Sequence, residues 1–167
     1  MEIHHGAGAQ LYKKCKSLAP LKTGEAVITK GYELPNPYVI HTLGPVYTKE
    51  KNPAEKLSLC YKNCLRRAEE KKLSSIAFST ISVETSGYPL KEAAEIALQA
   101  TCEESVNLKY LKTIYFVFND SKTKDIYCDT FNRLLEEIRR EEHEKFLKEE
   151  PDIELSEEIK NLSPWKR

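Results

Sequence analysis

The chain of 167 residues lacks several features that mark specialised classes of protein. No apolar run approaches the roughly 18 residues of a membrane-spanning helix. The first residues, Met1-Glu2-Ile3-His4-His5, do not have the pattern of a signal peptide. Basic and acidic residues number 26 each, so bulk charge gives no argument for nucleic-acid or membrane binding. We therefore expect a cytoplasmic protein that binds neither nucleic acid nor a membrane.

The cysteines also lack an organised pattern, because there are five of them and no Cys-x-x-Cys pair. An odd number without such a pair indicates neither a disulfide framework nor a zinc site. We therefore expect a reducing compartment, no metal and no cofactor. Cys60 and Cys64 lie one helical turn apart on an apolar stripe, and we interpret them as small buried hydrophobes.

What the sequence does contain is a regular alternation of strand and helix patterns, without internal repeats. Short apolar runs predict strands at 25–29, 38–43, 75–81 and 113–118. Helical spacing of apolar residues predicts helices at 10–18, 53–72, 90–106 and from Tyr127 to Ile138. Four strands alternating with four helices predict a three-layer α/β/α domain.

The apolar pattern also sets the expected domain boundary. Residues 139–145 offer almost nothing to bury, and residues 151–167 are charged and sparse in apolar side chains. We therefore expect one domain at 1–140 and a charged helical extension and tail at 141–167. Residues 151–167 form either a flexible tail or a segment that packs back on the domain.

The most informative stretch runs from Ser75 to Pro89. A short apolar run leads into a hydroxyl-rich turn with Gly87, and Pro89 then opens an alanine-rich helix. In an open α/β sheet, anionic ligands bind at the carboxyl end of a strand, where the free amides of the next helix face them. This pattern predicts a phosphate-bearing ligand at residues 82–87.

Several motifs resemble, in order and in spacing, those of the macro domain family. They are Ile3-His4-His5-Gly6-Ala7-Gly8, the strand and turn at 23–35, Tyr38-Val39-Ile40-His41-Thr42-Leu43-Gly44-Pro45, Ile76-Ala77-Phe78, and Gly87-Tyr88-Pro89 with the helix start at 92–97. The resemblance covers residues 2–135. It implies binding of ADP-ribose-type nucleotides and, in several branches of the family, hydrolysis of ADP-ribosyl or O-acetyl-ADP-ribose esters.

The resemblance also implies site residues. His4 matches a histidine of the hydrolase branch and is the catalytic candidate, since an imidazole can act as acid or base near neutral pH. The ligand-binding candidates are Ser82, Val83, Glu84, Thr85, Ser86, Gly87, Tyr88, Phe118 and Asn119. Gly87 is expected to let the backbone approach the ligand or to adopt a positive φ. His41, which alternates with Ile40 in a strand, is interpreted as a packing residue.

The chain departs from the family pattern ahead of Ile3. The family places two strands, an Asn-rich segment and a Gly-rich loop there, and this sequence contains none of them. Because the second of those strands lies in mid-sheet, the strands at 38–43 and 75–81 lose their shared neighbour. Three alternatives follow: an N-terminally shortened copy, direct pairing of the two strands, or a partner that fills the gap. We expect self-association through the open sheet edge.

A second departure lies in the ligand loop. Glu84 stands where the family has its first glycine, and Ser86 stands where it has an aromatic residue. A carboxylate about 5 Å from a diphosphate charge repels it by roughly 3 kcal/mol at an effective dielectric of about 20. That repulsion exceeds the stabilisation that a helix N-terminus typically gives to an anion. We therefore expect weak or no binding of ADP-ribose unless Glu84 points outward.

Two other functions remain open from the sequence. The first is a non-catalytic interaction protein, derived from a macro domain that has lost its nucleotide site, which binds another protein through its sheet and its C-terminal helix. The second is some other nucleotide-binding α/β enzyme. Glu84 and the lack of an Asn-rich segment favour the interaction protein, whereas the Gly87-Tyr88-Pro89 helix start favours nucleotide binding.

Overall fold

The structure is a computed structural model that describes residues 2–149. Its contacts divide the chain into two units, Met1–Phe131 and Asn132–Arg167. All sites discussed below lie in the first unit. Of the second unit, the structure describes the part of the last helix that follows Phe131.

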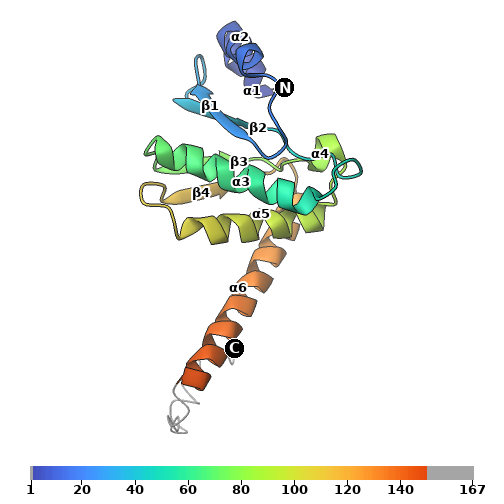
Figure 1. The fold of residues 1–167 in the computed structure, drawn as a ribbon, viewed down its shortest axis with the longest axis vertical. Coiled ribbons are helices and arrows are strands. Elements are labelled where there is room, and N and C mark those ends of the chain that lie inside the picture. The colour runs from blue at the N-terminus through green and yellow to red at the C-terminus, as the bar shows by residue number, and fades with distance from the viewer. Residues whose placement is uncertain (1, 150–167) are drawn as a thin grey trace. The chain divides into compact units, whose positions relative to one another are not determined.

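Figure 1 shows the order of the elements. The strands are β1 (Ala26–Lys30), β2 (Tyr38–Thr42), β3 (Ser75–Phe78) and β4 (Thr113–Phe116). The helices are α1 (Glu2–Gly6), α2 (Gly8–Leu18), α3 (Pro53–Glu70), α4 (Val83–Ser86), α5 (Leu90–Ser105) and α6 (Ser121–Glu149). The four predicted strands and four predicted helices are all found, and the α/β class is confirmed.

Most elements lie within two residues of their predicted bounds, and two differ by more. The third strand stops at Phe78 instead of residue 81, because the chain then turns and Ser82 adopts a left-handed conformation with φ 65°. The last helix begins at Ser121 instead of Tyr127. Its start is stabilised by Asp120, whose Oδ1 accepts a hydrogen bond from the Thr123 backbone N–H at 2.8 Å.

The strands form two separate two-stranded sheets. β1 pairs with β2 in antiparallel fashion, and β3 pairs with β4 in parallel. Within residues 2–149 no ladder joins β2 to β3, so direct pairing of these two strands is not what the structure shows. Helix α3 contacts β1, β2 and β3, and it therefore covers strands of both sheets.

The core is centred on α3 and on the aromatic residues beneath it. Tyr61 is fully buried, and its ring lies 5.1 Å from the Phe78 ring. Cys60 and Cys64 are buried as predicted, with 0% and 3% of their surfaces exposed. Burial raises the pKa of Cys64 to about 12, so this thiol stays protonated at neutral pH and acts as a small apolar side chain.

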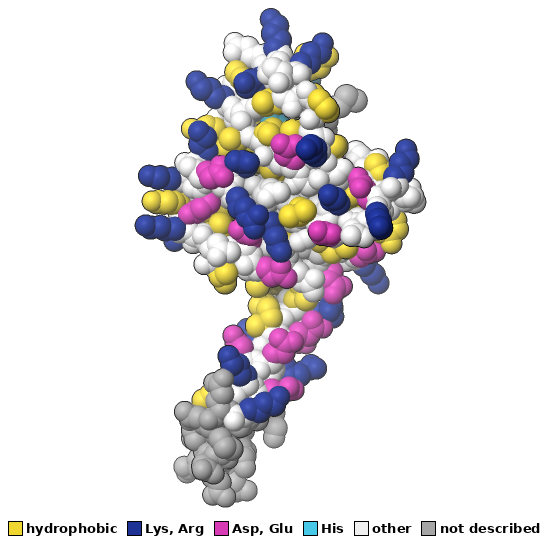
Figure 2. Space-filling view, in the orientation of Figure 1, with side chains coloured by type: hydrophobic (Ala, Val, Ile, Leu, Met, Phe, Trp, Pro, Cys, Tyr) yellow, Lys and Arg dark blue, Asp and Glu magenta, His cyan; other side chains and the backbone are white. Residues whose placement is uncertain are grey.

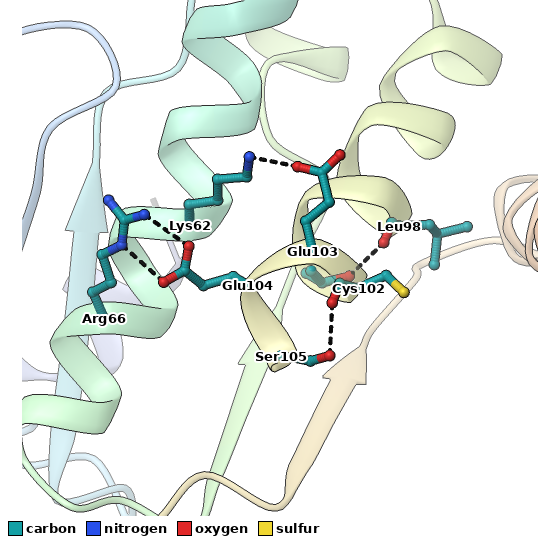
Figure 3. A network of polar contacts seen from close by, with 8 residues as sticks. Lys62, Arg66, Leu98, Cys102, Glu103, Glu104 and Ser105 are labelled. Carbon is teal, nitrogen blue, oxygen red and sulfur yellow. Dashed lines mark hydrogen bonds and ion pairs between the residues drawn. The ribbon is translucent and has the colours of Figure 1, made fainter. Parts of the chain in front are cut away.

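Ion pairs between charged side chains connect α3 to α5, as Figure 3 shows. Lys62 Nζ lies 2.6 Å from a Glu103 carboxylate oxygen. Arg66 donates through Nε and Nη2 to the two oxygens of Glu104, at 2.9 and 2.8 Å. This paired geometry suits a guanidinium and a carboxylate, and it links the two helices.

The surface carries both signs of charge. On the face drawn in Figure 2, Lys and Arg side chains mix with Asp and Glu side chains over α3 and α5, and Lys and Arg gather around α2. Among the described residues, no helix combines the length and apolar character that crossing a bilayer requires.

Candidate functional site

The predicted ligand loop follows β3 and leads into α5. It contains the single turn of helix α4, and a left-handed residue stands at each end of that turn, Ser82 with φ 65° and Gly87 with φ 67°. The Ser82 carbonyl accepts hydrogen bonds from the N–H groups of Ser86 and Tyr88, each at 3.1 Å, which close the loop. A Cβ added at Gly87 would meet nothing within 4 Å. The predicted positive φ of Gly87 is therefore confirmed, and conformation rather than space favours glycine there.

Ser82 is the most unusual residue of the loop. It is 5% exposed, and among the described residues its hydroxyl has no hydrogen-bond partner. The loop after β2 lies directly against it, since a Cβ added at Gly44 would collide with the Ser82 side chain. An unsatisfied buried hydroxyl costs about 1–3 kcal/mol. Such a group, at the end of a strand and ahead of a helix, is suited to donate to a polar ligand.

Two tyrosines and a glutamate hold the loop in place. Tyr47 donates its backbone N–H to the Ser86 carbonyl at 3.2 Å. The hydroxyls of Tyr47 and Tyr88 donate to the two carboxylate oxygens of Glu92, each at 3.2 Å. Burial and then the Glu92 charge raise the pKa of Tyr88, and the hydrogen bond to Glu92 raises the pKa of Tyr47, so both hydroxyls remain donors at neutral pH. The Tyr47 and Tyr88 rings meet edge to face at 4.8 Å.

Tyr47 and Glu92 were not among the residues predicted for the site. The short spacing between Tyr88, just before α5, and Glu92, in the first turn of α5, is a signal that could have identified their contact. Nothing in the local sequence marks Tyr47, which reaches the loop from a distant segment.

The remaining loop candidates differ in exposure. Glu84 and Thr85 are exposed, whereas Val83 and Ser86 are half-buried. Glu84 lies in the first turn of α4. An exposed carboxylate is screened by water and salt, which weakens the repulsion expected between Glu84 and a diphosphate.

Phe118 and Asn119 follow β4. Phe118 is half-buried, and its ring centroid lies 4.6 Å from that of Tyr127 in α6. Asn119 is exposed. Phe118 therefore packs against Tyr127 of α6, and among the described residues no contact was found between Phe118 and the 82–88 loop.

His4 lies in a different neighbourhood from the loop. It is exposed on α1, and its ring centroid lies 5.9 Å from that of His41 in β2. None of the described contacts joins His4 to residues 82–88. Cys15 of α2 completes this neighbourhood, with its Sγ 3.9 Å from either ring nitrogen of His41.

The His41 side chain is half-buried and held by Thr29, whose Oγ1 lies 2.9 Å from His41 Nε2. Burial, and then the nearby His4, lower the pKa of His41. Burial raises the pKa of Cys15. Both shifts favour the uncharged side chains. The packing role predicted for His41 agrees with its burial, but the grouping of His4, Cys15 and His41 was not predicted.

Comparisons with known proteins agree with the motifs. A sequence profile described as Macro domain matches residues 1–97 of the 167. An uncharacterized protein of Fusobacterium nucleatum is 42% identical over 136 residues, which cover 80% of this chain and 77% of that protein. The O-acetyl-ADP-ribose deacetylase of Salmonella newport is 39% identical over 131 residues, covering 75% and 73%.

Solved structures show the same likeness. The Oceanobacillus iheyensis macrodomain with ADP is 36% identical and superposes with a TM-score of 0.78, covering 81% of this chain and 75% of that one. The Trypanosoma brucei macrodomain in complex with ADP-ribose is 35% identical, with a TM-score of 0.69 and coverage of 75% and 53%. Profile, relatives and fold agree, and the chain therefore belongs to the macro domain family.

Proposed function

We propose that this chain binds ADP-ribose-type nucleotides through residues 82–88, with the diphosphate at the carboxyl end of β3. The observation that carries the proposal is the buried Ser82 hydroxyl without a described partner, placed in the loop between β3 and α5, at the N-cap of the one-turn helix α4. Free amides at a helix N-terminus favour an anion. Macrodomains solved with ADP or ADP-ribose support the choice of ligand.

Calorimetric titration with ADP-ribose tests this proposal. Because Glu84 opposes the diphosphate, we expect a dissociation constant weaker than about 1 μM, which corresponds to less than about 8 kcal/mol of binding free energy. Ser82→Ala should weaken binding further. Ser75→Ala is the matched control, since Ser75 is exposed at the start of β3, whereas the ligand loop follows the end of that strand. No binding at millimolar ADP-ribose, or equal effects of the two variants, contradicts the proposal.

We propose binding rather than hydrolysis as the activity of these residues. Hydrolysis needs a group that activates water at the reacting ribose. The candidate for that role is His4, and its described contact is with His41 instead of the ligand loop. Release of acetate from O-acetyl-ADP-ribose by the wild type, and its loss in His4→Gln, would show that the chain is a hydrolase after all.

We also propose that the chain self-associates through its open sheet edges, defined as the unpaired edges of β2 and β3. The exposed Leu43 (46% exposed) at the end of β2 adds apolar surface there, and such edges are templates for strand pairing. Sedimentation should give a mass that rises with concentration. Leu43→Lys should reduce it, whereas Val106→Lys, at an 84% exposed site after α5, should not. A monomer at high concentration contradicts the proposal.

We also propose that the protein is located in the cytoplasm. All five cysteines are free thiols, which suits a reducing compartment. Fractionation of cells that make the protein tests this directly, and recovery in the periplasm or medium contradicts it.

A further inference from the structure

Three side chains able to bind a transition metal converge beside β2. His4 of α1, Cys15 of α2 and His41 of β2 each offer one ligand atom, and these atoms all lie within 4.8 Å of one another. The three residues come from separate elements, so no short motif in the sequence contains them. This explains why cysteine spacing alone indicated no zinc site.

The tautomer of His41 sets which of its ring nitrogens is free to bind a metal, and Thr29 lies beside one of them. Thr29 Oγ1 lies 2.9 Å from His41 Nε2, and the same hydroxyl donates to the Val39 carbonyl at 3.4 Å. A hydroxyl has one hydrogen, so when Thr29 donates to Val39 its oxygen accepts from Nε2–H of His41. In that tautomer His41 Nδ1 carries the free lone pair, and both ring nitrogens lie 3.9 Å from Cys15 Sγ. Metal-bound histidines characteristically donate their other N–H in this way.

The spacing of the three groups is close to that of a tetrahedral site. With metal–ligand bonds of about 2.0–2.3 Å, ligand atoms are about 3.3–3.8 Å apart and two imidazole centroids are about 5 Å apart. The observed separations are 3.9 Å from Cys15 Sγ to His41 Nδ1 and 5.9 Å between the His4 and His41 centroids. His4 is exposed, so a change of rotamer can close the remaining gap without displacing a buried neighbour.

We propose that His4, Cys15 and His41 form a binding site for a divalent transition metal of the zinc class. Two imidazole nitrogens and one thiolate are ligands that zinc prefers, and three protein ligands leave the fourth position for water. The set contains no carboxylate, which disfavours magnesium and calcium. The proposed site shares no residue with the 82–88 loop and does not depend on nucleotide binding.

Cobalt titration of the reduced protein tests the proposal, because Co²⁺ accepts the same types of ligand as zinc. We expect a thiolate-to-cobalt charge-transfer band that saturates at one equivalent and disappears when zinc is added. Cys15→Ser should abolish the band. His4→Gln and His41→Gln should each weaken cobalt binding by roughly tenfold or more.

Cys102→Ser and His5→Gln are the matched controls, since both side chains are exposed and neither belongs to the cluster. Both should keep the band and the affinity of the wild type.

Zinc should raise the melting temperature of the wild type but not of Cys15→Ser. Circular dichroism shows whether each variant folds. If His41→Gln fails to fold, His4→Gln still tests the set, because His4 is exposed. Absence of the band in the wild type, or its survival in Cys15→Ser, overturns the proposal.

Discussion

At the scale of single residues, the ligand loop carries two groups with opposite effects on an anion. The Ser82 hydroxyl is buried without a described partner and is suited to donate to a phosphate oxygen. The Glu84 carboxylate, two residues later, is exposed in the first turn of α4. A negative charge there stabilises the start of the helix while it repels a diphosphate. The affinity of the loop depends on which effect is larger, and this can be measured by mutation.

We predict that Glu84→Gly strengthens the binding of any diphosphate ligand, since it removes the charge and restores backbone freedom at that position. Glu84→Gln separates the two contributions, because it removes the charge alone. The gain should be several-fold in low salt and smaller in high salt, where the repulsion is screened. Calorimetry with ADP in both buffers measures this gain. An unchanged affinity in low salt means that Glu84 is too far from the ligand to matter.

At the scale of elements, helix packing depends on charged pairs of unequal burial. The Glu104 side chain is 7% exposed beside Arg66, whereas the Glu103 side chain is 64% exposed beside Lys62. A buried carboxylate that loses its partner keeps its desolvation penalty. An exposed carboxylate regains water and loses little. The two neighbouring pairs between α3 and α5 should therefore contribute differently to stability.

We predict that Arg66→Ala lowers the free energy of unfolding by about 1–2 kcal/mol, less than for a fully buried pair because Arg66 is itself half exposed. Lys62→Ala, one helical turn away, should cost less than about 1 kcal/mol. Urea unfolding of both variants provides the comparison. Equal losses would show that burial of Glu104 does not decide the energetics of this interface.

The end of β3 shows how far the local sequence pattern predicts where a strand stops. The central strand was expected to reach residue 81 because Ile81 continues the apolar run, yet it ends at Phe78. The chain turns after Phe78 toward the left-handed Ser82, and within this turn the Ile81 backbone N–H donates to the Tyr61 hydroxyl of α3 at 3.4 Å. A hydrogen bond to another element cannot be read from the strand's own residues.

At the scale of the whole molecule, the chain divides into two units, Met1–Phe131 and Asn132–Arg167. Residues 141–146 of α6 are exposed, in agreement with a sequence that offers almost nothing to bury there. The expected tail at 151–167, including Trp165, lies outside the described residues. The boundary predicted at residue 140 therefore stays a prediction that truncation can test.

We predict that a chain ending at Arg140 melts within a few degrees of the full chain, because the removed helical residues have no apolar stripe to bury. Differential scanning calorimetry of the two chains is the measurement. A Trp165→Ala variant of the full chain is the control for the tail. A larger fall in melting temperature, shared by Trp165→Ala, would show that the tail packs on the domain.

The order of strands and helices, the burial of Cys60 and Cys64 and the left-handed Gly87 were determined by the sequence itself. Each depends on local properties, namely the period of apolar residues and the backbone freedom of glycine. Only the tertiary structure decided which distant side chains meet. It brought Tyr47 to Glu92, and it placed His4, Cys15 and His41 together. It also left β2 and β3 in separate sheets. Such contacts join segments far apart in the chain, so they are set by how the helices and strands pack and by no local pattern.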